Sequence, residues 1–159
     1  MKLNTARFGE IEIEEDRIFN FVMPIIGFDM LHKFIILDPN KDTLFKWLQS
    51  IEDPALAFPI ISVSALNLDY TIDLPDNIVE TLDIKNVESL LVMNITSIPQ
   101  DNPKGTTINL LAPLIFNLDN QNAAQIVLSG SGYDISYPMF KEKLEFLRNK
   151  MLVITRKNG

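Results

Sequence analysis

The sequence predicts a mainly β fold: a small antiparallel β-barrel-like single domain with one or two short helices. Two observations are local: many short runs have strand composition, and turns rich in proline, asparagine and aspartate separate them. The third is that 47% of the 159 residues are hydrophobic, which is enough to fill the core of one domain. Closing such a sheet into a barrel would also remove exposed strand edges.

The strands are predicted from period-two alternation and from apolar runs. Residues 10–14 alternate glutamate with isoleucine, so Ile11 and Ile13 share one face of a strand and the carboxylates take the other. Pro59 lacks a backbone donor, so its run is predicted to be an edge or bulged strand. The further strand-like runs are Ile18–Val22, Lys33–Leu37, Thr43–Leu48, Ala57–Ile61, Leu68–Ile72, Leu90–Thr96, Thr106–Leu111 and Ala124–Leu128.

Two helices are predicted. Pro75 suits a first helical position, and Ile78, Val79 and Leu82 then share one face. The second is a C-terminal amphipathic helix that begins near Pro138. Its apolar stripe recurs at helical spacing and consists of Phe140, Leu144, Leu147 and Met151.

Charge divides the chain unequally. Residues 1–140 carry 8 basic and 19 acidic side chains, whereas residues 141–159 carry 6 basic and 2 acidic ones. A net negative body argues against direct binding to nucleic acid or to an anionic membrane, and it suits a basic protein partner. The basic end is either a solvated terminal segment or a segment that docks on a partner or on the chain itself.

Other function classes have little support in the sequence. The chain has no cysteine and one histidine, His32, which excludes thiolate chemistry and any site that needs two imidazoles. The sequence has no G-x-S-x-G nucleophile elbow. It also has no phosphate-binding loop, because Lys104 precedes Gly105 and the glycine that such a loop needs upstream is missing. We therefore expect no catalytic residue, no metal site and no cofactor. Without a signal peptide or a long apolar run, a cytoplasmic protein is expected.

Two residues each have two possible roles, one structural and one in binding. Trp47 is the only tryptophan and serves either as a core plug or as an anchor for a partner. Asn109 lies within an apolar run, where a buried amide must find hydrogen-bond partners. It serves either as a tie at a bulge or strand end, or as a direct contact to a ligand.

Several motifs occur in one order along the chain. Residues 48–58, Leu-Gln-Ser-Ile-Glu-Asp-Pro-Ala-Leu-Ala-Phe, match an L-Q-S-x5-L-A-F signature, and residues 109–115, Asn-Leu-Leu-Ala-Pro-Leu-Ile, resemble an N-L-x-A-P-I-V element. The remaining matches are Phe8-Gly9-Glu10-Ile11, Phe21 through Gly27-Phe28, Asp69-Tyr70, Gln125 to Leu128 with Tyr133, and Tyr137-Pro138-Met139-Phe140. In this order the motifs resemble the FliW family of flagellar assembly factors over roughly residues 1–147. The family's G-[IL]-P-G-F turn reads Pro24-Ile25-Ile26-Gly27-Phe28 here, so its first glycine and its proline are changed, and Val63 replaces a further proline.

The resemblance implies a regulator rather than an enzyme. It implies a FliW-like β-barrel domain over residues 1–147, followed by a basic tail over residues 148–159. Proteins of this family are expected to bind CsrA, an RNA-binding translational repressor, and to bind flagellin, which competes for the factor. Oligomeric state is not predicted. A small-ligand-binding β-barrel, which needs a large apolar pocket, remains the alternative.

Partner-binding residues are predicted from the motif positions, which include the carboxylates of Asp53 and Asp69. Phe58→Ala is expected to weaken folding, whereas charge reversal at Asp53 or Asp69 is expected to weaken binding of the regulator. The predicted partner-binding residues are Gln49, Ser50, Asp53, Phe58, Asp69, Tyr70, Asn109 and Pro113.

Overall fold

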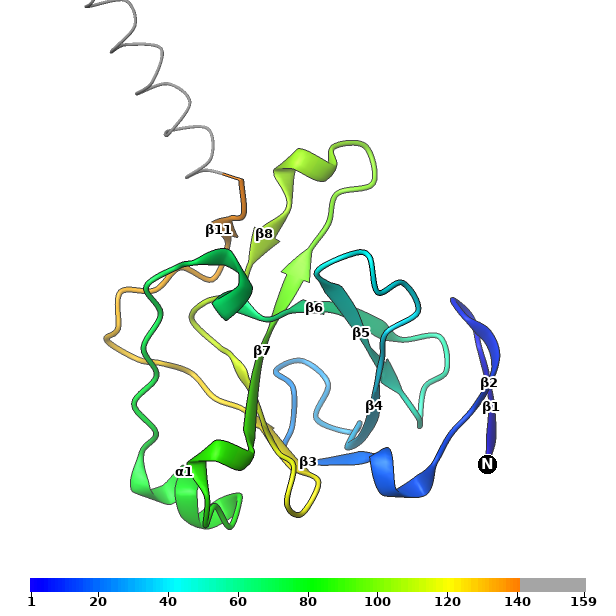
Figure 1. The fold of residues 1–159 in the computed structure, drawn as a ribbon, viewed down its shortest axis with the longest axis horizontal. Helices are drawn as coiled ribbons and strands as arrows, with labels where there is room; N and C mark the ends of the chain where they lie inside the picture. Colours follow the sequence, from blue (N-terminus) through cyan, green and yellow to red (C-terminus); the bar gives the residue numbers. More distant parts are fainter. Residues whose placement is uncertain (141–159) are drawn as a thin grey trace, which may run out of the picture.

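Seven strands close into a ring in the computed structural model, which describes residues 1–140 (Figure 1). The order is β7-β6-β5-β4-β3-β10-β9, and β9 pairs back onto β7 to complete the barrel. These strands are β3 (Phe19–Met23), β4 (Lys33–Leu37), β5 (Phe45–Ser50), β6 (Ala57–Ile61), β7 (Leu90–Ser97), β9 (Leu114–Asn117) and β10 (Asn122–Gln125). The barrel fold that the sequence predicts is therefore confirmed.

Every pair in the ring is antiparallel except β3 with β10, which is parallel. Outside the ring, β1 and β2 form a separate hairpin, and β8 and β11 extend the sheet beyond β7. The bounds of these strands are Lys2–Thr5 for β1, Gly9–Glu12 for β2, Thr107–Ile108 for β8 and Tyr137–Pro138 for β11.

Within residues 1–140, one short α-helix and four 3-10 turns connect the strands. Helix α1 (Asp76–Thr81) follows Pro75, which takes the N-cap position, and buries Ile78 and Leu82, so this helix is confirmed. The 3-10 turns are Glu15–Arg17, Val63–Leu66, Val87–Ser89 and Pro103–Gly105. Pro138 lies in β11 rather than at a helix start, and the rest of the predicted C-terminal helix, like the boundary at residue 147, lies outside the described residues.

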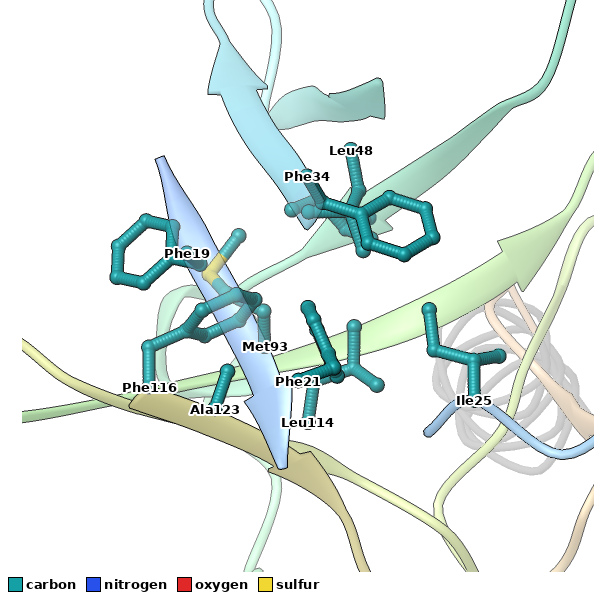
Figure 2. Packing of buried hydrophobic residues seen from close by; sticks show 10 residues of the cluster. Phe19, Phe21, Ile25, Phe34, Leu48, Met93, Leu114, Phe116 and Ala123 are labelled. Carbon is teal, nitrogen blue, oxygen red and sulfur yellow. The ribbon is translucent and has the colours of Figure 1, made fainter. Parts of the chain in front are cut away.

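Aromatic rings fill the barrel. Phe21 packs edge-on against Phe34 and Phe116, with ring centroids 5.2 and 5.7 Å apart, and all three side chains are fully buried. Figure 2 shows these rings with Leu48, Leu114 and Met93 around them. Burial of each such side chain contributes about 1.5–3 kcal/mol, so this cluster stabilises the fold strongly.

Several predicted strand bounds are wrong. Residues 68–72 form no ladder, although their side chains alternate between the core and solvent, because no strand pairs with them and the Thr71 backbone bonds Tyr133 Oη instead. The predicted strand 106–111 shortens to β8, since the Asn109 amide still bonds the Ile95 carbonyl of β7 but the Leu110 amide turns to the carbonyls of Ile108 and Asp134. Strands β1, β9 and β11 were not among the predicted runs.

Pro59 does not lie on an edge strand, because β6 is paired with both β5 and β7. The ladder to β7 is registered at Ile60 and Ile61, beyond the proline. The Pro59 carbonyl accepts a hydrogen bond from the Thr96 hydroxyl at 3.1 Å. A side chain of β7 thus contacts the backbone where the proline offers no donor of its own.

Phe116→Ala is expected to lower the free energy of unfolding by about 3–5 kcal/mol, because it opens a cavity in the ring of phenylalanines. Urea denaturation followed by tryptophan fluorescence measures the loss. Leu118→Ala is the matched control, since Leu118 is 50% exposed and its loss should stay within about 0.5 kcal/mol. Equal effects of the two substitutions would contradict the packing assignment.

Candidate functional site

The L-Q-S motif organises the loop between β5 and β6. Gln49 Nε2 donates to the carbonyls of Ser50, Pro54 and Leu56 at 2.9, 3.1 and 3.2 Å, while Ser50 Oγ accepts from the Asp53 amide at 2.9 Å. Gln49 and Ser50 are both fully buried. Their side chains therefore set the shape of residues 51–56, and this loop carries Glu52 and Asp53 to the surface.

Glu52 ties this loop to the start of β4. Its carboxylate accepts hydrogen bonds from the backbone amides of His32 and Lys33. These two amide donors lower the pKa of Glu52 below the ordinary value of 4.5, because they favour the charged carboxylate. Asp53 Oδ1 accepts from the Ala55 amide at 3.1 Å, and both carboxylates remain exposed.

Trp47 connects the β1–β2 hairpin to the barrel. The Arg7 guanidinium lies 4.2 Å from the centre of the indole, and the Phe8 ring packs edge-on at 5.8 Å. The Ala6 amide donates to the Pro54 carbonyl at 3.1 Å. Trp47 thus anchors a part of this chain through contacts with a ring and a cation of the hairpin loop.

A second polar cluster joins Tyr70, Asn94 and Asn109. Asn94 Nδ2 donates to Tyr70 Oη at 3.1 Å and to the Asn109 carbonyl at 2.9 Å, and Tyr70 Oη donates to the Leu110 carbonyl. Asn109 Oδ1 accepts from the Ala112 amide at 3.0 Å, as a tie beyond the end of β8. Burial raises the pKa of Tyr70, and the hydrogen bond from Asn94 opposes that rise.

The remaining predicted residues have different surroundings. Phe58 is half-buried beside Phe28, at a centroid distance of 5.1 Å, and Pro113 is buried with its carbonyl accepting from the Ile126 amide. Asp69 is exposed. The eight residues therefore do not form one cluster, because Asp53 precedes β6 while Asp69 follows it, at opposite ends of that strand.

Sequence reasoning missed a surface groove of about 950 Å³ next to Gln125. Val22, Ile26 and Val127 line it with exposed apolar side chains, and Asp73 is the one charged group among its described lining residues. Gln125 spans its base, accepting from the Ile26 amide at 2.7 Å and donating to the Ala112 carbonyl at 3.1 Å. Pro24, which ends β3, was the available signal.

The side chains of these clusters hold loops in position and leave carboxylates exposed for contact with other molecules. Within residues 1–140, no group of three or more histidine, aspartate or glutamate side chains could hold a metal ion. No helix in that part of the chain has the length and apolar character to cross a membrane. The fold and its polar clusters define a small, filled β-barrel with exposed acidic loops.

The comparisons with known proteins give the family. The model of the FliW protein family matches residues 2–139. A flagellar assembly factor FliW from Pseudothermotoga lettingae is 37% identical, with 97% of this chain and 96% of the relative covered. One from Caldanaerobacter subterraneus is 38% identical over 89% of this chain and 95% of the relative. The chain belongs to the FliW family.

A solved structure has the same fold. The crystal structure of the flagellar assembly factor FliW superposes with a TM-score of 0.80 at 32% sequence identity. The match covers 87% of this chain and 96% of that one. The resemblance drawn from the motifs is therefore confirmed.

Gln49→Ala is expected to lower the free energy of unfolding by about 1–3 kcal/mol, because it leaves carbonyls of the loop 51–56 without their donor. Denaturation measures the loss, and hydrogen exchange at the Leu56 amide reports whether the loop loosens. Gln100→Ala, in an exposed loop, should be near neutral. An unchanged Leu56 exchange rate would show that Gln49 does not organise the loop.

Glu52→Gln is expected to lower stability at neutral pH but not in acid. Glu52 has a lowered pKa in the folded state, so its stabilisation is present above the ordinary pKa of 4.5 and is lost as pH falls through the folded value. The difference in unfolding free energy between wild type and variant should shrink over that window. A difference that stays constant with pH would show that the charge of Glu52 does not stabilise the folded state.

Proposed function

We propose that this protein binds a CsrA-type RNA-binding repressor and relieves its repression of flagellin synthesis. The observation that carries the proposal is family membership, since the curated relatives that match almost the whole chain are named flagellar assembly factors. Flagellin is the second proposed partner and displaces the repressor by partner exchange. The protein acts by binding in the cytoplasm and not by catalysis.

Charge supports a basic protein as the first partner. The 19 acidic and 8 basic side chains of residues 1–140 steer a basic RNA-binding protein toward the barrel and repel RNA itself. The exposed carboxylates of Glu52 and Asp53 lie on a loop that Gln49 and Ser50 hold in one shape. A pre-shaped acidic loop loses little conformational freedom on binding.

The predicted partner-binding set then separates into two roles. Asp53 and Asp69 are the exposed members and are proposed as direct contacts. Gln49, Ser50, Tyr70, Asn109 and Pro113 are proposed to act through the shape of the loops that they hold, and Phe58 through packing.

The small-ligand alternative gains no support from the barrel interior. Phe21, Phe34 and Phe116 occupy the space where such a ligand would lie, and each is fully buried (Figure 2). The groove beside Gln125 is on the surface, and its walls are separate from this cluster.

Asp53→Lys and Asp69→Lys are each expected to weaken binding of the purified repressor several-fold, more strongly at low salt, with little change in stability. Isothermal titration calorimetry measures the affinity, and thermal unfolding checks the fold. Asp101→Lys, an exposed residue in the β7–β8 connection, controls for net charge. Equal affinities for wild type and both variants would contradict the proposal that Asp53 and Asp69 contact the repressor.

The same titration, repeated with flagellin present, tests partner exchange. Flagellin should weaken binding of the repressor, and the repressor should weaken binding of flagellin by the same factor. Simultaneous binding without mutual weakening would contradict the exchange. Binding of flagellin alone would leave the protein as a flagellin-binding factor and overturn the regulatory proposal.

A further inference from the structure

One stretch of the barrel wall has a free strand edge beside the groove. Strand β10 lies between β9 and β3, and its parallel pairing with β3 ends where Met23 is registered with Ala124. Beyond that point the Ile26 amide donates to the side chain of Gln125, at 2.7 Å, rather than to a backbone carbonyl. Residues 126–128 therefore continue past β10 without β3 beside them.

The other side of residues 126–128 is hydrogen-bonded. The Ile126 amide donates to the Pro113 carbonyl at 3.1 Å, and the Leu128 amide donates to the Leu111 carbonyl at 2.8 Å. These two bonds continue the register of the β9–β10 ladder, with a step of two residues on each chain. The segment is therefore extended, and one of its edges is already used.

Val127 lies between the two bonded residues and turns its backbone toward the groove. Because successive residues of an extended chain direct their backbone groups to opposite edges, the Val127 amide and carbonyl face the side that β3 has left. Among the described residues, neither group has a hydrogen-bond partner. This edge offers one donor and one acceptor to an added strand, which is how extended peptides bind at open sheet edges.

Exposed apolar side chains line the groove around this edge. Val22, Ile26 and Val127 are 37, 62 and 49% exposed, respectively. The volume of the groove, about 950 Å³, is at the upper end of the range of about 300–1,000 Å³ that is usual for binding pockets. The groove therefore has room for a short peptide segment, whose apolar side chains would cover the exposed ones.

The opposite wall of the groove supplies a charge. Thr71 and Asp73 are exposed and line the groove. Ile72 and Leu74 pack instead against the cluster around Ile78. Asp73 is the only charged side chain among the described lining residues, so a lysine or arginine in the bound segment is favoured and an acidic residue is repelled.

We propose that this groove binds an extended segment of another protein as an added strand against Val127, with a lysine or arginine of that segment beside Asp73. The complementary partner is a β-forming peptide with apolar side chains at alternate positions and one basic residue. The groove shares no residue with the β5–β6 loop. The assignment therefore does not depend on binding of the repressor or of flagellin.

An NMR titration of the full chain tests the proposal with the synthetic peptide acetyl-Val-Thr-Val-Thr-Lys-Thr-amide, which carries two valines and the lysine on one face of a strand. We expect saturable binding that slows exchange of the Val127 amide about tenfold at saturation. The Leu128 amide, bonded to Leu111, is the internal control and should not change. No binding at millimolar peptide would overturn the proposal. A Val127 amide already protected in the free protein would also overturn it, because another part of the protein or a second copy would then hold this edge.

Two substitutions at one position separate backbone pairing from side-chain contact. Val127→Pro removes the free amide donor without removing a hydrogen bond of the described fold, whereas Val127→Ala keeps the donor and shortens the side chain. The peptide should bind Val127→Pro about threefold more weakly, or less tightly still, than it binds Val127→Ala. Thermal unfolding checks that both variants are folded. Equal affinities of the two folded variants would overturn strand addition.

A charge exchange tests the contact with Asp73 even if the proline variant does not fold. Wild type should bind the lysine peptide several-fold more tightly than the same peptide with glutamate in place of lysine, and Asp73→Lys should reverse this preference. Asp119→Lys, an exposed residue in the β9–β10 turn, is the control for net charge and should keep the preference of wild type. An unchanged preference in Asp73→Lys would overturn the placement of the basic residue.

Discussion

The closure of β9 onto β7 is the contact on which the rest of the molecule depends. Four successive pairs, from Leu90 with Asn117 to Met93 with Leu114, join the last antiparallel hairpin to a strand that already carries β6. Without this ladder the sheet would have two exposed edges, and Phe116 would not meet Phe21 inside the ring. The apolar cluster and the closed hydrogen bonding therefore require each other.

Closure also fixes where the loops lie, and buried polar side chains fix their shapes. Gln49 holds the β5–β6 loop, Asn94 holds the chain after β8, and Asn117 Nδ2 donates to the Leu82 carbonyl at 2.9 Å at the end of α1. Each amide satisfies backbone groups that loops leave without ladder partners. The acidic surface is thus presented by loops whose geometry is set from inside the barrel.

The sequence predicted the elements whose signal is local. The alternation at Ile11 and Ile13, the runs that became β4 and β6, and the proline before α1 all depend on near neighbours. Residues 68–72 had strand composition but lacked a partner, and partner availability is decided by closure rather than by composition. The residues 114–117 of β9 were hidden in a continuous apolar run, where buried strands and other core segments look alike.

The candidate site was predictable in part for the same reason. Motif positions identified Gln49, Ser50 and Asn109, but only the fold shows that their amides and hydroxyl serve neighbouring backbone groups. Pro24 signalled the end of β3, but the groove itself arises where β3 parts from β10, and this pairing of strands distant in sequence has no local signal. Gln125, which bridges that parting, carries no signal of its own in the sequence.

The parallel contact between β3 and β10 has a consequence for synthesis of the protein. The hydrogen bond from Ile26 to Gln125 spans 99 residues, and β10 cannot pair with β3 until it has left the ribosome. The β3 edge of the sheet formed by β3 to β6 therefore stays unpaired until β10 has been translated. A chain that is cut short before β10 has no way to close, so folding of this barrel shows that translation has passed β10.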